Sequence, residues 1–315
     1  MEYRVLGKTG IRVSRLCFGT LTVGPLQVNL PVEEGAAVIR YALEAGVNFL
    51  DTAESYRTYA HIRKALQGWD GEVIIATKSY AYSHRGMRES LEEALRALSR
   101  DHIDIFLLHE QESALTLRGH WEAFEFLLQA REKGLVRAVG ISTHSVEGVR
   151  AAARVPEIDV IHPLVNVAGV GIQGGTREDM LAAIEEAAAF GKALYAMKVL
   201  GGGHLIARAE EAFSFALQIP YLASVAVGMR SREEVDFNVR FFTGREVPAE
   251  LRQILEKRER RLHIEEWCCG CGRCVEKCGA GALSLSGGRA VVDHSRCRLC
   301  GYCGAACPHF CIKVL

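Results

Sequence analysis

The sequence lacks an excess of charge of one sign and lacks any long uninterrupted apolar run. Its 38 Lys and Arg residues balance 38 Asp and Glu residues, so the charge gives no indication of a nucleic-acid or anionic-membrane partner. The longest uncharged stretches, such as 213–229, contain Gln, Pro and Ser and indicate buried elements rather than membrane spans of about 20 apolar residues. The N-terminal MEYRVLGKTG has no apolar core and no cleavage site. We therefore expect no nucleic-acid partner, no membrane span and a cytoplasmic location.

Cysteine is almost missing from the first 267 residues, where Cys17 stands alone. The other ten of the 11 cysteines follow Trp267. A disulfide scaffold needs an oxidising compartment, and the sequence shows no export signal, so metal binding is the better interpretation. We expect Cys17 to be a small core residue on a strand.

A dinucleotide-binding glycine fingerprint is also missing after the first expected strand, which counts against an open doubly wound sheet. What is present is a regular alternation of short apolar runs with amphipathic stretches whose apolar residues recur every three or four positions. The runs that we expect to form strands are 15–19, 47–51, 73–78, 103–109, 136–142, 160–166, 193–198 and 224–228. The stretches that we expect to form helices are 32–45, 59–66, 87–99, 118–133, 146–154, 177–190, 207–218 and 232–240. Eight such units predict an α/β fold of the (β/α)8 TIM-barrel class.

The flanking segments complete the predicted organisation. Residues 3–5 and 11–13 flank the turn-rich GKTG and predict a short hairpin across the bottom of the barrel. Pro248 opens a charged helix through about residue 262, whose 256–261 run we expect to be a solvated face. The predicted domains are a barrel over 1–245, a connecting helix over 246–263 and a small iron–sulfur domain over 264–315. No internal repeat is expected beyond the strand–helix period.

The cysteines of the last segment form two runs with one spacing, C-x2-C-x2-C-x3-C. The first run is Cys268, Cys271, Cys274 and Cys278, and the second is Cys297, Cys300, Cys303 and Cys307. This spacing resembles that of bacterial ferredoxins with two [4Fe–4S] clusters, in which the fourth cysteine of each run ligates the other cluster. The resemblance implies one cluster on Cys268, Cys271, Cys274 and Cys307, and a second on Cys297, Cys300, Cys303 and Cys278.

Three cysteine thiolates on one tight loop can bind three corners of a cubic cluster. The fourth corner must be bound by a cysteine from elsewhere in the chain. A domain of about 50 residues needs such a staple because its core is too small. The alternative is zinc, which also binds sites of four cysteines, but two runs of this spacing favour clusters. Cys269 and Cys311 are left over.

Chemistry in a (β/α)8 barrel sits at the C-terminal ends of the strands. The ends of the second, third and fourth expected strands supply Asp51 with Tyr56 one loop later, Lys78 and His109. We expect Asp51 to keep Lys78 charged, Lys78 to lower the pKa of Tyr56, and His109 to position a substrate oxygen. Tyr56 would then be a general acid. Each residue alone has a structural interpretation, such as a helix cap or a core histidine, and the conjunction favours catalysis.

Over residues 1–245 the sequence resembles the aldo-keto reductase family. The resemblance lies in RVLGKTGIRVSRLCFGT, NFLDTAESY, IIATK, DIFLLHE, GLVRAVGIS and AMKVLGGG. It implies reduction of carbonyl compounds with NADP(H) or NAD(H), with Asp51, Tyr56, Lys78 and His109 as the catalytic tetrad. The implied nucleotide contacts are Gly19, Thr20, Ser142, Asn166, Lys198, Leu200, Gly202, Gly228, Arg230 and Asn238.

Several positions depart from the family pattern. Thr143 and His162 stand where an Asn and a Gln usually hold the nicotinamide amide, and Met197 replaces a stacking tyrosine. Near the adenosine, Glu234 stands where an arginine is expected and Phe237 where an acid is expected. Arg57 replaces the glycine that usually follows the tyrosine, which would bring a guanidinium near the mouth, although a surface position is the plainer interpretation.

The two halves pose a chemical problem, because nicotinamides move two electrons at once and clusters move one. The favoured hypothesis is an oxidoreductase acting on a carbonyl or alcohol substrate, with clusters that exchange electrons with the barrel or with a carrier such as ferredoxin. A flavin, held at a phosphate loop in 201–203, is a further candidate cofactor. The alternatives are an electron-transfer or redox-sensing protein that uses the barrel as a scaffold, and a barrel enzyme whose clusters are structural.

Overall fold

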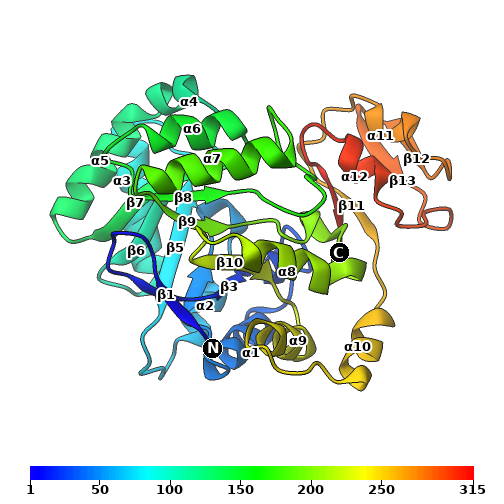
Figure 1. Cartoon of the computed structure of the whole chain (residues 1–315), viewed down its shortest axis with the longest axis horizontal. Helices are drawn as coiled ribbons and strands as arrows, with labels where there is room; N and C mark the ends of the chain where they lie inside the picture. Colours follow the sequence, from blue (N-terminus) through cyan, green and yellow to red (C-terminus); the bar gives the residue numbers. More distant parts are fainter.

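Eight parallel strands close into a barrel in the computed structural model, which describes residues 1–315 (Figure 1). The strands pair in the order β10-β3-β4-β5-β6-β7-β8-β9. Their bounds are β3 (Leu16–Gly19), β4 (Phe49–Asp51), β5 (Ile74–Ser79), β6 (Ile103–Leu108), β7 (Val136–Thr143), β8 (Val160–Pro163), β9 (Ala193–Ala196) and β10 (Ser224–Gly228). Each lies within a few residues of an expected run, so the predicted barrel is confirmed.

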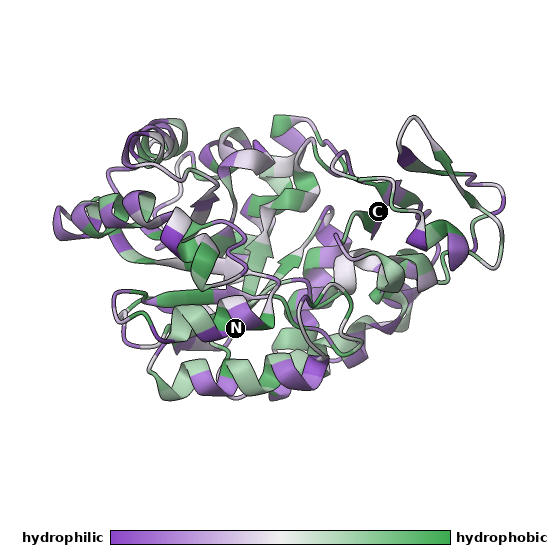
Figure 2. Ribbon diagram, turned by 90° about the horizontal axis from the view of Figure 1, so that it is seen from above, coloured by the Kyte–Doolittle hydropathy of each residue, from purple (hydrophilic) through white to green (hydrophobic).

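Helices surround the barrel and bury one face each. They are α1 (Val32–Glu44), α2 (Tyr59–Ala65), α3 (His84–Leu98), α5 (Trp121–Glu132), α6 (Val146–Ala153), α7 (Arg177–Ala189), α8 (Ala209–Gln218) and α9 (Arg232–Phe242). Hydrophilic and hydrophobic residues alternate along these ribbons, as expected for amphipathic helices (Figure 2). The sequence prediction missed α4 (Ala114–Gly119), which begins at a capping box formed by Ser113 and Thr116.

The strand interiors make the core. A cluster of 58 buried residues lies between strands and helices, and a second of 14 fills the barrel itself. The hairpin of β1 (Tyr3–Val5) and β2 (Arg12–Ser14) brings Leu6, Ile11 and Val13 into this inner cluster, which confirms the predicted plug. Cys17 is fully buried in the inner cluster, as expected. Short 3-10 turns follow some strands, namely η1 (Thr20–Val23), η2 (Glu54–Tyr56), η3 (Gly201–Gly203) and η4 (Ile206–Arg208).

Residues after the barrel form a short helix and a small module. The expected helix from Pro248 to about residue 262 is too long, because α10 (Ala249–Glu256) ends early and Leu262 pairs with Val314 in a sheet. The module contains β11 (Leu262–Ile264), α11 (Arg273–Glu276), β12 (Leu283–Ser286), β13 (Arg289–Val292), α12 (Tyr302–Ala306) and β14 (Ile312–Val314). β11 pairs antiparallel with β14, and β12 pairs antiparallel with β13.

The module is a repeat that the sequence prediction missed. A strand–helix–strand unit, β11–α11–β12, is followed by a second one, β13–α12–β14, and the two cysteine runs are 29 residues apart from Cys268 to Cys297. Each helix begins after a glycine with positive φ, Gly272 at 79° and Gly301 at 84°. Glycine suits this left-handed conformation, in which other residues are strained.

The module sits against the loops at the C-terminal ends of the barrel strands, and the end of the chain lies between the two parts (Figure 1). Phe310 is 2% exposed and packs with Leu164, Val170 and Met197. A Cβ on Gly171 or Gly202 would come within 2.8 Å of its ring, so glycine is required at both barrel loops. His204 of the barrel contacts the carbonyl oxygen of Ile312 at 2.9 Å through Nε2. None of the helices in the structure is long and apolar enough to cross a membrane.

Candidate active site and cysteine module

A buried ion pair lies at the C-terminal end of the barrel. Lys78 Nζ donates to Asp51 Oδ1 at 2.7 Å and to the carbonyl oxygen of Thr52 at 2.8 Å. The Lys78 and Asp51 side chains are 1% and 7% exposed. Burial acts to raise the pKa of Asp51, but the charge of Lys78 and the hydrogen bonds to the carboxylate outweigh it and lower that pKa. The two residues therefore form a fixed charged pair, as expected.

Tyr56 and His109 lie beside this pair. The Tyr56 ring is 5.1 Å from Lys78 Nζ and packs edge-on to His109 at 5.7 Å between ring centres. Tyr80 stacks on the other side of His109 at 4.3 Å, and its hydroxyl donates to Glu110 at 2.6 Å. The structure thus brings all four predicted catalytic residues together.

One electrostatic expectation is wrong. Lys78 does not lower the pKa of Tyr56, which is raised well above its ordinary value by burial and by the negative charges of Asp51 and Glu110. The reason is geometric, because Lys78 donates to Asp51 and Thr52 and faces the ring of Tyr56 rather than its hydroxyl. Burial also lowers the pKa of His109 to about 3. Both residues are therefore neutral near pH 7.

Two residues that sequence reasoning did not connect with Asp51 complete its environment. Tyr195 donates its hydroxyl to Asp51 Oδ2 at 2.9 Å. His162 stacks on Tyr195 at 3.7 Å and places Nε2 3.6 Å from the same carboxylate oxygen. Burial lowers the pKa of His162 to about 3, so it is neutral near pH 7. The only signal in the sequence was the position of both side chains on neighbouring strands.

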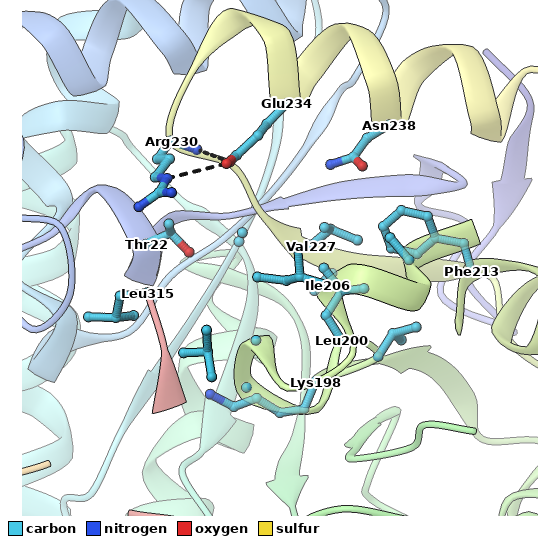
Figure 3. Close-up of a pocket in the computed structure, with 18 of the residues that line it drawn as sticks. Thr22, Lys198, Leu200, Ile206, Phe213, Val227, Arg230, Glu234, Asn238 and Leu315 are labelled. Atoms are coloured by element: carbon cyan, nitrogen blue, oxygen red, sulfur yellow. Dashed lines mark hydrogen bonds and ion pairs between the residues drawn. The ribbon is translucent and has the colours of Figure 1, made fainter. Parts of the chain in front are cut away.

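A cavity of about 780 Å³ opens beside these residues, within the range of small-molecule sites (Figure 3). It extends from Asp51 and Tyr56 to α9, and Val314 and Leu315 of the module form part of its wall. The predicted nucleotide contacts that line it are Gly19, Lys198, Leu200, Gly202, Gly228, Arg230 and Asn238.

Three other predicted contacts do not line the cavity. Thr20, Ser142 and Asn166 are fully buried, and their side chains bond within the protein. Asn166, for example, donates to the carbonyl oxygen of Val170 at 2.8 Å and accepts from its N–H at 3.0 Å. These side chains shape the strand ends, and their contact with a cofactor stays a prediction.

Arg57 is exposed and does not line the cavity. Its φ of 55° lies in the left-handed region, which explains why a glycine is usual at this position. The glycine that the family usually has at position 57 therefore reflects the left-handed backbone at this position, and the Arg57 side chain is not a group of the cavity.

The module brings the cysteines of the two runs together. The four cysteines that the sequence assigned to one cluster, Cys268, Cys271, Cys274 and Cys307, line one small cavity, and Cys269 and Cys311 line it too. The neighbouring thiols Cys307 and Cys268 add to burial in raising the pKa of Cys274. Cys297 and Cys300 act in the same way on Cys303, whose pKa burial raises to about 11. Three of the four cysteines assigned to the second cluster are thus neighbours.

Backbone donors point at the sulfur atoms. Ala282 N donates to Cys278 Sγ at 3.2 Å, and Cys311 N donates to Cys307 Sγ at 3.3 Å, four residues on from the cysteine in both repeats. Ala290 N donates to Cys268 Sγ at 3.4 Å. Such bonds stabilise thiolate ligands and tune cluster potentials. Of the two remaining cysteines, Cys269 is exposed and Cys311 is buried.

No group of three or more His, Cys, Asp or Glu side chains is placed to hold a single metal ion. The group that the two cysteine runs hold therefore stays a prediction.

Comparison with known proteins agrees with this barrel and its buried pair. Residues 15–212 match the aldo/keto reductase family. The chain belongs to this family. Its members are NAD(P)H-dependent oxidoreductases. The family match ends before the cysteine runs begin, so it describes the barrel alone.

Curated relatives share part of the barrel. An aldo-keto reductase of Mycolicibacterium paratuberculosis is 33% identical over 147 residues, which are 43% of this chain and 51% of that protein. Aldo-keto reductase YhdN of Bacillus subtilis is 28% identical over 183 residues, 53% of this chain and 54% of that protein. The chain spans about half the length of these curated relatives.

Solved structures match more of the fold. PA4992 of Pseudomonas aeruginosa, assigned to the aldo-keto reductases, superposes with a TM-score of 0.67 at 27% identity and covers 77% of this chain and 95% of its own. A holo aldo-keto reductase from Bacillus halodurans gives a TM-score of 0.64 over 82% of this chain and 96% of its own, and its 23% identity shows the fold alone.

Proposed function

We propose that the chain reduces a carbonyl compound, or oxidises the corresponding alcohol in reverse, with a nicotinamide cofactor. We further propose that its module carries two [4Fe–4S] clusters that exchange electrons with the barrel site or with a carrier such as ferredoxin. The observation that carries the proposal is the buried Asp51–Lys78 pair beside Tyr56 at the mouth of a 780 Å³ cavity. A fixed buried charge pair beside a phenol in a cleft is typical of a catalytic site.

The side chains divide the work on a carbonyl group. Tyr56 is a neutral phenol near pH 7 because its pKa is raised, so it can donate a proton to the oxygen of the substrate. The unpartnered Nδ1 of His109 leaves a ring nitrogen free to change partners during binding. Asp51 fixes the position of Lys78 below the Tyr56 ring, and Tyr195 donates to the other oxygen of the same carboxylate. A phenol that holds its proton favours the reductive direction.

The cavity suits a nicotinamide dinucleotide. Its volume is in the range for such ligands, and the predicted contacts Gly19, Gly202 and Gly228 lie along its wall. A bound nicotinamide supplies the hydride that the protein's own side chains cannot provide. The chain's contribution is to bind and orient the dinucleotide, to exclude water and to hold the proton on Tyr56.

The cysteine module suits clusters for three reasons. Its eight run cysteines have the ferredoxin spacing, four of them surround one cavity, and backbone N–H groups are directed at their sulfur atoms. The ligands would be Cys268, Cys271, Cys274 and Cys307 for one cluster and Cys297, Cys300, Cys303 and Cys278 for the other. A flavin in the barrel cavity would convert between one-electron and two-electron steps.

The first test is an anaerobic titration of the reconstituted protein with NADPH and with NADH, following the visible absorbance of the clusters. Bleaching is the expected result, because it requires both nicotinamide binding and electron transfer to the module. If dithionite bleaches the clusters but neither nucleotide does, the proposed electron exchange is wrong.

A variant tests the barrel separately. Tyr56→Phe removes the proton donor, so we expect turnover of a simple aldehyde such as 4-nitrobenzaldehyde to fall by about 10²–10⁴-fold with nucleotide affinity kept. Tyr82→Phe, at an exposed tyrosine, is the matched control and should keep full turnover. Wild-type turnover in Tyr56→Phe would remove Tyr56 from the proposed mechanism.

A further inference from the structure

Two of the cations that line the large cavity have no carboxylate partner. Three others are neutralised by a neighbouring glutamate in ion pairs, namely Arg208 with Glu211, Arg230 with Glu234 and Arg252 with Glu210. Lys198 and Arg260 have no Asp or Glu oxygen within 4.0 Å. Because desolvating a charge without a partner is costly, an unpaired cation in a cavity indicates a place for an anion.

Arg260 belongs to the charged run 256–261 that the sequence predicts as a solvated face. Four of its six residues are exposed, as expected, whereas Arg258 and Arg260 are half-buried. The run folds back onto α9, where Arg258 donates to Glu234 at 2.9 Å and lies 3.2 Å from Glu233. Arg258 and Arg230 therefore occupy both carboxylates. Arg260 makes one hydrogen bond, from Nη2 to the carbonyl oxygen of Leu255 at 3.1 Å, which leaves most of its donors free.

The carboxylates at this end are taken up by the other two arginines. Arg230 and Arg258 pair with Glu233 and Glu234. Glu256 also acts on Arg260, but from beyond 4.0 Å, so the guanidinium of Arg260 has no direct carboxylate partner. Glu234, at the place where the family resemblance expects an arginine, is neutralised by Arg230 and Arg258 and does not repel an anion. Figure 3 shows the Arg230–Glu234 pair on the cavity wall.

Lys198 marks a second anionic position. In Figure 3 its side chain lies across the cavity from Arg230 and Glu234, on the β9 side. Its backbone is held at a φ of 58°, a strained conformation for lysine, and its ammonium makes no hydrogen bond. A ligand with negative groups at two separated positions satisfies both cations.

We propose that Arg260, contributed by the segment between barrel and module, binds a phosphate group of the ligand in the cavity. The identity of that ligand as a nicotinamide dinucleotide rests on the proposed function, while the phosphate site itself rests on the unpaired guanidinium. The phosphate is either the diphosphate, which NADH and NADPH share, or the additional phosphate of NADPH. Arginine suits it because its planar fork binds phosphate oxygens in pairs.

The test measures equilibrium binding of NADPH, NADH and inorganic pyrophosphate to the full chain. The variants are Arg260→Gln, which removes the charge, and Arg260→Lys, which keeps it. Arg252→Gln removes an equal charge from the same cavity where Glu210 already pairs with it, so it is the matched control. Circular dichroism confirms that each variant is folded.

We expect Arg260→Gln to weaken NADPH binding about tenfold or more, Arg260→Lys to recover part of it, and Arg252→Gln to change it less than about threefold. A loss confined to NADPH assigns Arg260 to the additional phosphate, and an equal loss for both nucleotides assigns it to the diphosphate. If the wild type binds pyrophosphate through Arg260 but binds neither nucleotide, the phosphate site stands and the proposed function falls. Unchanged binding of every probe in Arg260→Gln, or equal losses in Arg252→Gln, overturns the phosphate site.

Discussion

The barrel and the module differ in what holds each of them together. The barrel rests on two clusters of 58 and 14 buried residues, which cover its strands inside and out. The module has one cluster of seven buried residues, and two of these, Cys274 and Cys303, are predicted cluster ligands. A core of that size cannot hold an independent fold. The barrel core is therefore large enough to hold its fold by packing, whereas we expect the module to depend on its cysteines.

The largest expected effect is a loss of bound iron, and it comes from replacing one cysteine of the small cavity that both cysteine runs line. Cys307→Ser should lose about half of the bound iron or more, because one cluster loses a ligand and the two repeats lose a link. Iron and sulfide assays measure the loss, and limited proteolysis should cut within 264–315 while the barrel survives. Cys269→Ser, at an exposed cysteine outside both sets, is the control and should keep its iron. Full iron content in Cys307→Ser would contradict the ligand assignment.

The next effect belongs to the barrel alone. Lys78→Met leaves the Asp51 carboxylate buried without its cation, so the free energy of unfolding should fall by about 3–5 kcal/mol. Urea unfolding followed by circular dichroism measures this fall, and the iron content should not change. Lys64→Met, on the exposed face of α2, should stay within about 0.5 kcal/mol of the wild type. A loss of iron together with stability would show that the two parts are not separable in this way.

A smaller effect depends on pH. The pKa of His162 is about 3 in the folded protein against 6.5 when unfolded, so the unfolded chain binds more protons between these values. Stability is complete above about pH 6.5 and is lost as the pH falls towards 3, by about 2 kcal/mol for this histidine at pH 5. His162→Gln removes the titrating group, so the loss between pH 8 and pH 5 should shrink by that amount in urea unfolding.

Burial also lowers the pKa of His109 to about 3 and that of His144 to about 4. The His162→Gln variant should therefore still lose part of its free energy of unfolding on acidification. His102→Gln, at a histidine on the exposed edge of the barrel, is the comparison variant. If His162→Gln and the wild type lose equal stability on acidification, His162 is not buried in its neutral form.

The smallest effect concerns one backbone position. Arg57 has a left-handed backbone conformation, which is strained for arginine and not for glycine. Arg57→Gly removes this strain, so the free energy of unfolding should rise by about 0.5–1 kcal/mol. Arg57→Ala removes the side chain but keeps the strain, and we expect no gain from it. A gain in both variants, measured by thermal unfolding, would assign the effect to the guanidinium instead.

The sequence predicted the barrel well because its strands and helices have local apolar periodicity. It also placed Asp51, Tyr56, Lys78 and His109 together, since strand ends meet at one rim of a barrel. It could not show which way Lys78 points, and the pKa of Tyr56 was predicted in the wrong direction for that reason.

The missed features are contacts between segments far apart in the chain. Leu262 pairs with Val314 although the charged run before it predicts a helix, and Leu315 lines a cavity whose other wall begins at Gly19. Tyr195 reaches Asp51 from 144 positions away. No local pattern reports such contacts, so tertiary structure overrides local preference there.

Phe310 has a consequence for how the protein is made. Its ring anchors the end of the module to Met197 and neighbouring residues, and so holds Val314 and Leu315 in the cavity wall. If the module carries the proposed clusters, its folding would wait for the delivery of iron and sulfide. A newly synthesised chain without them would have a finished barrel and an unfinished pocket. Cluster assembly would then be a step in the maturation of the enzyme.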